Sequence, residues 1–234
     1  MFKLKLYQSM PYRCPYIPAN IAYHHTSAPG AGLSKSIYSQ LINLGYRRSG
    51  ERIHIPNCHT CQQCVSLRVP VASFSPSRSQ RRTIKKNNSL KAAIISQPDP
   101  AEYYSLYQNY IHHRHPESEN MHDVKATFSD FLFSSWSESF VIEIRLPNKK
   151  LVCVSICDPL NQGWSAVYTF YDINFTEYSL GTYAILSQIN LLRQHKMDYL
   201  YLGYWIRDCN KMNYKKQFRP CEGFIQNRWT LIDE

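Results

Sequence analysis

Apolar and polar residues alternate with two different periods along this chain, and the two periods together predict a mixed α/β fold. Residues 180–195 show helical spacing, with Ile185, Ile189 and Leu192 on one face, and predict the longest helix. Strict alternation predicts strands at residues 140–146, 151–157, 164–171, 199–205 and 223–232. Three strands, a long helix and a further strand therefore follow one another in the second half of the chain.

The first half predicts shorter elements. Residues 1–33 show no sustained period, and we expect irregular structure there. The pattern predicts helices over 34–44, from Pro76 to about Asn87, from Asp99 or Pro100 onward and over 121–133, and strands over 66–74 and 90–96. We expect an N-terminal region over residues 1–98 and a catalytic domain over residues 99–234.

The segment after the predicted strand at 199–205 predicts a cationic helix. Four basic residues recur at every fourth position: Arg207, Lys211, Lys215 and Arg219. Asp208 could cap this helix and Pro220 would end it. The aromatic pair Tyr204 and Trp205 precedes it, and rings beside cations suit a nucleotide terminus. The alternative is an amphipathic helix with a solvated basic face.

The overall charge favours polyanionic partners. Lys and Arg number 27 against 17 Asp and Glu, so the formal net charge is +10. No stretch approaches the roughly 18 apolar residues of a membrane span, and the N-terminus lacks the apolar centre of a signal peptide. We therefore expect a cytoplasmic protein with no membrane partner, whose eight cysteines are thiols or metal ligands.

Three cysteines, Cys58, Cys61 and Cys64, fall in the pattern C-x2-C-x2-C. Thiolates at this spacing can reach one ion, and Cys14 would complete a set of four for zinc or an iron–sulfur cluster. His59 could replace Cys14 as the fourth ligand. The alternative is a group of ordinary reduced thiols.

The order of predicted elements, β-β-β-α-β-α-β, matches the acyltransferase fold called GNAT. In that fold the strands before and after the long helix splay apart, and the activated acyl donor lies in the gap. Coenzyme A would need a glycine-rich turn for its pyrophosphate at the helix start. The sequence SLGTY offers a single glycine there, which disfavours this donor.

Several motifs along nearly the whole chain resemble one known family. They are CPYIP at 14–18, GYRRSG at 45–50, C-x2-C-x2-C with SLRVPV at 58–71, SPSRSQRR at 75–82, VYTFYD at 167–172, SLGTYAIL at 179–186, YLYLGYWI at 199–206 and KMNYKKQFRP at 211–220. In this order they resemble the bacterial aspartate/glutamate leucyltransferases, relatives of the eukaryotic arginyl-tRNA–protein transferases. The resemblance implies a GNAT-like fold and transfer of leucine from leucyl-tRNA to the N-terminal Asp or Glu of a protein, which marks it for the N-degron pathway.

Such a reaction assigns expected roles to particular residues. Asp158 or Asp172 could remove the proton from the attacking amine, although either could instead cap a turn. A guanidinium would bind the acidic acceptor, and the candidates are Arg78, Arg81 and Arg82, which could equally bind tRNA phosphate. The candidates for binding the aminoacyl adenosine and the tRNA backbone are Tyr168, Tyr204, Trp205, Lys211, Lys215 and Arg219, with core packing as the alternative for Tyr168.

The chemistry itself requires no cofactor, since the donor ester is already activated. The eukaryotic relatives carry a C-x2-C pair and an adjacent Cys-Cys pair for their metal centre, and this chain departs from that arrangement. Two other functions remain open at this point: an N-acetyltransferase that uses acetyl coenzyme A, and a nucleic-acid-binding protein with a cysteine knuckle and no enzymatic activity.

Overall fold

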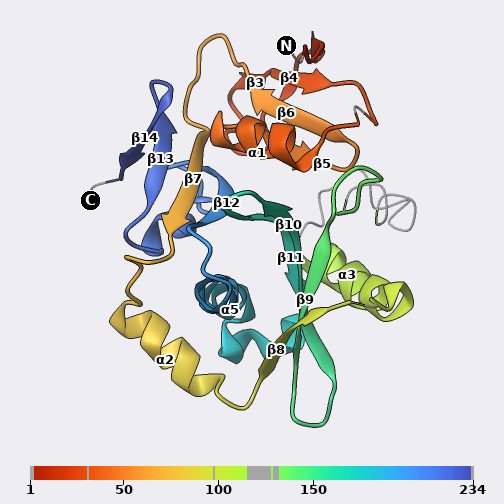
Figure 1. Cartoon of the computed structure of the whole chain (residues 1–234), viewed down its shortest axis with the longest axis vertical. Helices are drawn as coiled ribbons and strands as arrows, with labels where there is room; N and C mark the ends of the chain where they lie inside the picture. The colour runs from red at the N-terminus through yellow and green to blue at the C-terminus, as the bar shows by residue number, and fades with distance from the viewer. Residues whose placement is uncertain (1–2, 31, 97, 115–127, 129–131, 233–234) are drawn as a thin grey trace.

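The structure, a computed structural model, describes residues 3–30, 32–96, 98–114, 128 and 132–232 (Figure 1). Its centre is an eight-stranded mixed sheet in the order β14-β13-β7-β12-β11-β10-β9-β8. These strands are β7 (Val65–Pro70), β8 (Lys91–Ile95), β9 (Phe140–Arg145), β10 (Leu151–Leu160), β11 (Gly163–Tyr171), β12 (Tyr199–Trp205), β13 (Glu222–Ile225) and β14 (Arg228–Leu231). The expected α/β class is confirmed.

One pair of neighbouring strands in this sheet is parallel, and it is a short pair. β11 and β12 are joined by the crossover helix α5 (Leu180–Gln194) and pair only through Gly163–Ser165 and Tyr199–Tyr201. Beyond these residues β11 continues along β10, whereas β12 continues along β7. The two strands therefore splay apart toward their C-terminal ends, as the GNAT-like order predicts.

Helices cover both faces of the large sheet. On one face α5 packs its apolar stripe, including Ile189 and Leu192, against Leu67, Leu200 and Leu202. The helix α2 (Arg78–Lys86) lies beside α5 on that side (Figure 1). On the other face α3 (Pro100–Arg114) packs against β10 and β11. Burial of both faces explains why β10 is apolar along nearly its whole length.

A second, four-stranded sheet in the order β1-β4-β6-β5 lies with α1 (Lys35–Asn43) at one end of the large sheet (Figure 1). Its strands are β1 (Leu6–Gln8), β4 (His24–Ser27), β5 (Arg47–Ser49) and β6 (Arg52–Pro56), and a small ladder pairs β2 (Tyr12–Arg13) with β3 (Ile21–Ala22). Tyr38 and Ile53 pack from this part onto Tyr201 of β12. The large sheet takes β7 and β8 from before the expected domain boundary at residues 98 and 99.

Several expectations are corrected. Residues 1–33 contain four short strands in place of irregular structure. The last predicted strand, 223–232, is the hairpin β13–β14, because Gln226 and Asn227 adopt positive φ and turn the chain. A 3-10 helix, η2 (Ile173–Tyr178), precedes α5. Most of the helix predicted at 121–133 lies outside the described residues.

The predicted cationic helix at 207–219 is wrong. The chain forms turns and then the short 3-10 helix η3 (Asn213–Gln217). Cys209 and Phe218 are both buried at the two ends of this segment, and the backbone amides of Lys215 and Phe218 bond three residues back. A continuous α-helix would not place both residues inside. Among the described residues, no helix is long and apolar enough to cross a membrane.

Candidate active site

The splay between β11 and β12 leaves backbone groups without strand partners. Past Ser165, the edge of β11 that faces β12 forms no ladder with any described strand. Past Tyr201, the edge of β12 that faces β11 likewise forms no ladder with a described strand. At the same place the register of β12 against β7 shifts, and Gly203 adopts a φ of +79°. Free amides at such an edge can donate hydrogen bonds to a ligand that enters between the strands.

The helix η3 spans the open end of this splay. On the β12 side, Lys215 Nζ donates a hydrogen bond to the carbonyl oxygen of Tyr204 at 2.8 Å. On the β11 side, Tyr214 lies near Tyr171, and burial, followed by the proximity of the Tyr171 hydroxyl, raises the pKa of Tyr214. The segment that follows the splayed strand therefore turns back across it.

Lys215 is a buried cation, which corrects its expected place on an exposed stripe. The residue is 9% exposed. Burial, followed by the nearby charge of Arg47, lowers the pKa of the Lys215 ammonium from 10.5 to about 7. No carboxylate in the described part of the chain forms an ion pair with it. The Lys215 ammonium is therefore poorly placed to bind the phosphate backbone of a tRNA, since it is not at the surface.

Arg47 of β5 is the second buried cation here, and sequence reasoning missed it. Its Nη1 donates to the carbonyl oxygens of Tyr46 and Ile42, whereas its Nε and Nη2 have no partner among the described residues. The guanidinium carbon lies 5.7 Å from the centre of the Tyr204 ring. Burial lowers the pKa of Arg47, although Tyr204 and other tyrosines oppose this effect.

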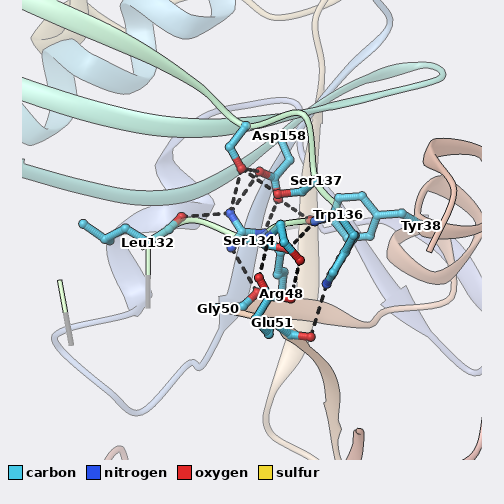
Figure 2. A network of polar contacts seen from close by, with 11 residues as sticks. Tyr38, Arg48, Gly50, Glu51, Leu132, Ser134, Trp136, Ser137 and Asp158 are labelled. Atoms are coloured by element: carbon cyan, nitrogen blue, oxygen red, sulfur yellow. Dashed lines mark hydrogen bonds and ion pairs between the residues drawn. The ribbon is translucent and has the colours of Figure 1, made fainter. Parts of the chain in front are cut away.

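Asp158, a candidate general base, is the centre of a structural network (Figure 2). It is fully buried, and its Oδ2 accepts hydrogen bonds from Arg48 Nε and from the Tyr38 hydroxyl, both at 2.6 Å. Its Oδ1 accepts from Arg48 Nη2 at 3.0 Å and from Ser139 Oγ at 2.5 Å. Both oxygens are thus engaged, and the network joins α1 and β5 to β10.

Arg48 extends this network to the chain before β9. Its Nη2 also donates to the carbonyl oxygen of Leu132 and its Nη1 to that of Gly50, as Figure 2 shows. Adjacent residues of a strand point to opposite sides, so Arg48 meets Asp158 while Arg47 meets Tyr204. A carboxylate held in this way suits a structural ion pair better than a proton acceptor.

Asp172, the other candidate base, also has structural contacts. Its Oδ1 accepts from the backbone amide of Asn174 and caps η2, and its Oδ2 lies 2.9 Å from Lys150 Nζ. Burial raises the pKa of the Asp172 carboxyl, but the bonds from Lys150 and Asn174 outweigh it and the pKa lies below its usual value. A lowered pKa makes this carboxylate a weaker base.

The three aromatic candidates are not brought together in one stack. Tyr168 is half-buried and packs edge to face against Tyr107 of α3. The Tyr204 hydroxyl donates to the carbonyl oxygen of Gly45 and so faces the smaller sheet. Trp205 belongs to the core under α5, and its Nε1 has no partner among the described residues.

The basic residues of α2 are exposed, and no described carboxylate forms an ion pair with them. They are Arg78, Arg81, Arg82, Lys85 and Lys86. A capping box of Ser77 and Gln80 fixes the start of α2, and Gln80 Nε2 donates to the carbonyl oxygen of Gln217 in η3. Lys211 is exposed and Arg219 is half-buried. The basic face of α2 is therefore anchored beside the splay while it remains open to solvent.

The four cysteines of the expected metal site line one cleft of about 610 Å³, together with Tyr16, Gly45 and Tyr204. Burial, followed by the neighbouring Cys14, Cys58 and Cys61, raises the pKa of the Cys64 thiol to about 12. Four thiols suit zinc or an iron–sulfur cluster in donor chemistry. Within the described ranges, however, no three His, Cys, Asp or Glu side chains are arranged to hold a metal ion.

Comparisons with known proteins agree over almost the whole chain. A family model described as the C terminus of arginine-tRNA-protein transferase matches residues 102–225, and the corresponding N-terminal model matches residues 12–82. The aspartate/glutamate leucyltransferase of Saccharophagus degradans is 40% identical over 230 residues, which cover 98% of each chain. That of Teredinibacter turnerae is 40% identical over 231 residues, 99% of this chain and 95% of the other.

Among solved structures, L-PGS from Bacillus licheniformis aligns with a TM-score of 0.49 and 8% identity over 62% of this chain and 48% of its own. The full-length relatives and the matching family models are decisive by themselves. This chain belongs to the arginine-tRNA-protein transferase family.

Proposed function

We propose that this protein transfers leucine from leucyl-tRNA to the N-terminal Asp or Glu of other proteins. The observation that carries the proposal is the full-length similarity to relatives named aspartate/glutamate leucyltransferase, at 40% identity. The splayed β11–β12 pair supports it, because it supplies a site for an acyl donor. The product would carry an N-terminal leucine, which marks it for the N-degron pathway in the cytoplasm.

The reaction is the aminolysis of an ester. The nitrogen of the acceptor's α-amine attacks the carbonyl carbon of the leucyl ester, a C–N bond forms, and the C–O bond to the terminal ribose breaks. The ribose oxygen leaves with a proton and the amine loses one, so atoms and charge balance. Because the ester is already activated, the enzyme mainly holds the two reactants together and stabilises the oxyanion.

Unpaired amides at the splayed edges of β11 and β12 are suitable donors to that oxyanion. The α-amine has an ordinary pKa of about 8, so an appreciable fraction is neutral near pH 7.5 and water can accept the remaining proton. Asp158 and Asp172 then act as structural groups. The reaction as proposed requires no cofactor, and the four cysteines take no part in its steps.

The exposed face of α2 is our candidate for the tRNA backbone. Its basic side chains are free of described ion pairs, and α2 reaches the start of α5, where Asn87 Nδ2 donates to the carbonyl oxygen of Tyr178. Phosphate groups bound there would lie beside the splay that takes the aminoacyl end. Lys211, on the exposed turn after β12, could add a further contact.

The start of α5 argues against acetyl coenzyme A as donor. Gly181 is the single glycine of this turn, and the ring of Tyr171 lies only 3.2 Å from where its Cβ would be. Ser179 makes no side-chain cap. A pyrophosphate needs a glycine-rich row of open backbone amides, and here a single glycine is present with an aromatic ring against it. A nucleic-acid-binding protein without activity would leave the splayed strands without a role.

A transfer assay tests the proposal. Purified protein is incubated with radiolabelled leucyl-tRNA or arginyl-tRNA and with peptides that begin with Asp, Glu or Ala and are otherwise identical. We expect label from leucyl-tRNA in the Asp and Glu peptides alone. Absence of transfer from either tRNA, together with acetylation of a peptide by acetyl coenzyme A, would overturn the proposal.

A further inference from the structure

One edge of the Arg47 guanidinium is free inside the protein. Nη1 is occupied by two backbone carbonyls, but Nε and Nη2 have no partner among the described residues although Arg47 is only 6% exposed. Nε and Nη2 are the two parallel donors that a carboxylate binds in a bidentate pair. An unpartnered buried charge costs several kcal/mol, so such an edge is rarely retained without a ligand.

A second cation converges on the same place. A Cβ built on Gly203 would lie 3.6 Å from Lys215 Nζ and 4.0 Å from Arg47 Nε, so both nitrogens approach one point over β12. Their polar neighbours are carbonyls, tyrosines, Cys64, Cys209 and His54, and burial lowers the pKa of His54 to about 4, so it is neutral near pH 7. No carboxylate among these described neighbours supplies a counter-charge to Arg47 or to the protonated form of Lys215.

The position of this pair relates it to the reaction. Gly203 is on β12 just past the last residue that pairs with β11, and η3 places Lys215 there, where its Nζ donates to the Tyr204 carbonyl oxygen of β12. A ligand held over Gly203 would therefore lie next to the point where β11 and β12 part, beside the proposed donor site. Arg47 also lies against the ring of Tyr204, which together with Gly45 lines the cysteine-lined cleft.

We propose that Arg47 and Lys215 bind the side-chain carboxylate of the acceptor's N-terminal Asp or Glu. This inference rests on the proposed function and gives the acceptor site its specificity-determining residues, in place of Arg78, Arg81 and Arg82. Arg47 supplies the two parallel hydrogen bonds and Lys215 adds a third donor and the second charge. A neutral Asn or Gln would leave two buried cations without a counter-charge and is rejected for that reason.

A phosphate of the tRNA fits this place less well than a carboxylate. The pair offers one bidentate edge and one ammonium, both deeply buried, whereas a nucleic-acid backbone is bound by several exposed cations in a row. The exposed face of α2 has that property. The two classes of ligand therefore have different candidate sites, which makes the assignment testable.

The test compares peptides that begin with Glu and Gln, with leucyl-tRNA as donor. We expect Arg47→Gln to lower kcat/KM for the Glu peptide by about 100-fold or more. The slow use of the Gln peptide and the KM for tRNA should stay close to wild type, so the Glu/Gln ratio collapses. Arg47→Lys keeps the positive charge but cannot form two parallel hydrogen bonds, and it should lower kcat/KM for the Glu peptide by at least about tenfold.

Arg52→Gln, on the exposed side of neighbouring β6, is the matched control and should leave the Glu/Gln ratio unchanged. Melting curves with a Glu peptide alone give a readout that does not depend on turnover, and the peptide should raise the Tm of wild type but not of Arg47→Gln. The inference is overturned if Arg47→Gln keeps the Glu/Gln ratio, or if it changes only the KM for tRNA. Failure of wild type to transfer leucine at all would instead overturn the proposed function.

Discussion

Replacing Lys215 by Met should stabilise the free protein, because Lys215 is a buried cation without a counter-charge. Its pKa falls from 10.5 to about 7 on folding, mainly through burial. At about 1.4 kcal/mol per pKa unit, this difference destabilises the folded state by about 5 kcal/mol at any pH below 7. Met keeps the length of the side chain but leaves the Tyr204 carbonyl without its donor, which costs about 2 kcal/mol. The net gain is about 3 kcal/mol at pH 6.

The gain depends on pH with a definite sign. Between pH 7 and pH 10.5 the unfolded chain holds a proton on Lys215 that the folded chain has lost, so wild type becomes more stable as the pH rises. Over two pH units, from 7 to 9, this amounts to about 3 kcal/mol. The advantage of the Met variant should therefore fall from about 3 kcal/mol at pH 6 to about zero at pH 9. Arg47, Cys64, Cys209 and Tyr204 face Lys215 in both proteins, so the difference between the two isolates the ammonium.

Urea unfolding followed by tryptophan fluorescence at pH 6 and pH 9 measures both quantities. In a chain of this size, 3 kcal/mol corresponds to a Tm shift of about 6–12 °C. The exposed Lys211→Met is the control and should stay within about 0.5 kcal/mol of wild type. A Lys215→Met variant that is destabilised at pH 6, or equally stabilised at both pH values, would show that the Lys215 ammonium does not destabilise the folded protein.

Two further changes test the other parts of the site. Asp158→Asn should lower the free energy of unfolding by about 3–5 kcal/mol, because Arg48 would remain buried without its counter-charge; a loss below about 1 kcal/mol in urea unfolding would contradict a structural ion pair. Replacing Arg78, Arg81 and Arg82 together by Gln should raise the KM for tRNA and reduce the salt dependence of its binding, by roughly 0.7 to 0.9 in slope for each lost phosphate contact. An unchanged salt dependence would show that α2 does not bind the tRNA backbone. A changed Glu/Gln ratio would show that these three arginines bind the acidic acceptor.

The arrangement of the catalytic domain could be predicted from the sequence because its elements have strong periods. The apolar stripe of α5 and the alternation in β9, β11 and β12 are long enough to identify each element, and their order implies the splay. The N-terminal strands have two to four residues each, too few for a period to be recognised. Their pairing partners are up to about thirty residues away, so only the tertiary structure defines them.

Two features of the site could not be predicted from the sequence, the inward position of Lys215 and the role of Arg47, because both depend on tertiary contacts. The four-residue spacing of Arg207, Lys211, Lys215 and Arg219 predicts an exposed stripe, but the burial of Cys209 and Phe218 forces another path and turns Lys215 inward. Such burial depends on residues far away in sequence.

Arg47 and Arg48 are equally difficult to distinguish in the motif GYRRSG. Both are buried, and their opposite roles depend on a carboxylate 110 positions further along the chain. The two adjacent arginines themselves were the available signal, since the strand β5 places one of them on each face.

The most direct test of the central claim is the initial rate of leucine transfer from leucyl-tRNA to four peptides that differ only in their first residue, Glu, Gln, Asp or Asn. We predict rapid transfer to the two acidic peptides and at least about 100-fold slower transfer to the peptides that begin with Gln or Asn, a difference that Arg47→Gln abolishes. Equal rates with the acidic peptides and their amides in the wild-type protein, or no leucine transfer to any of the four, would contradict it.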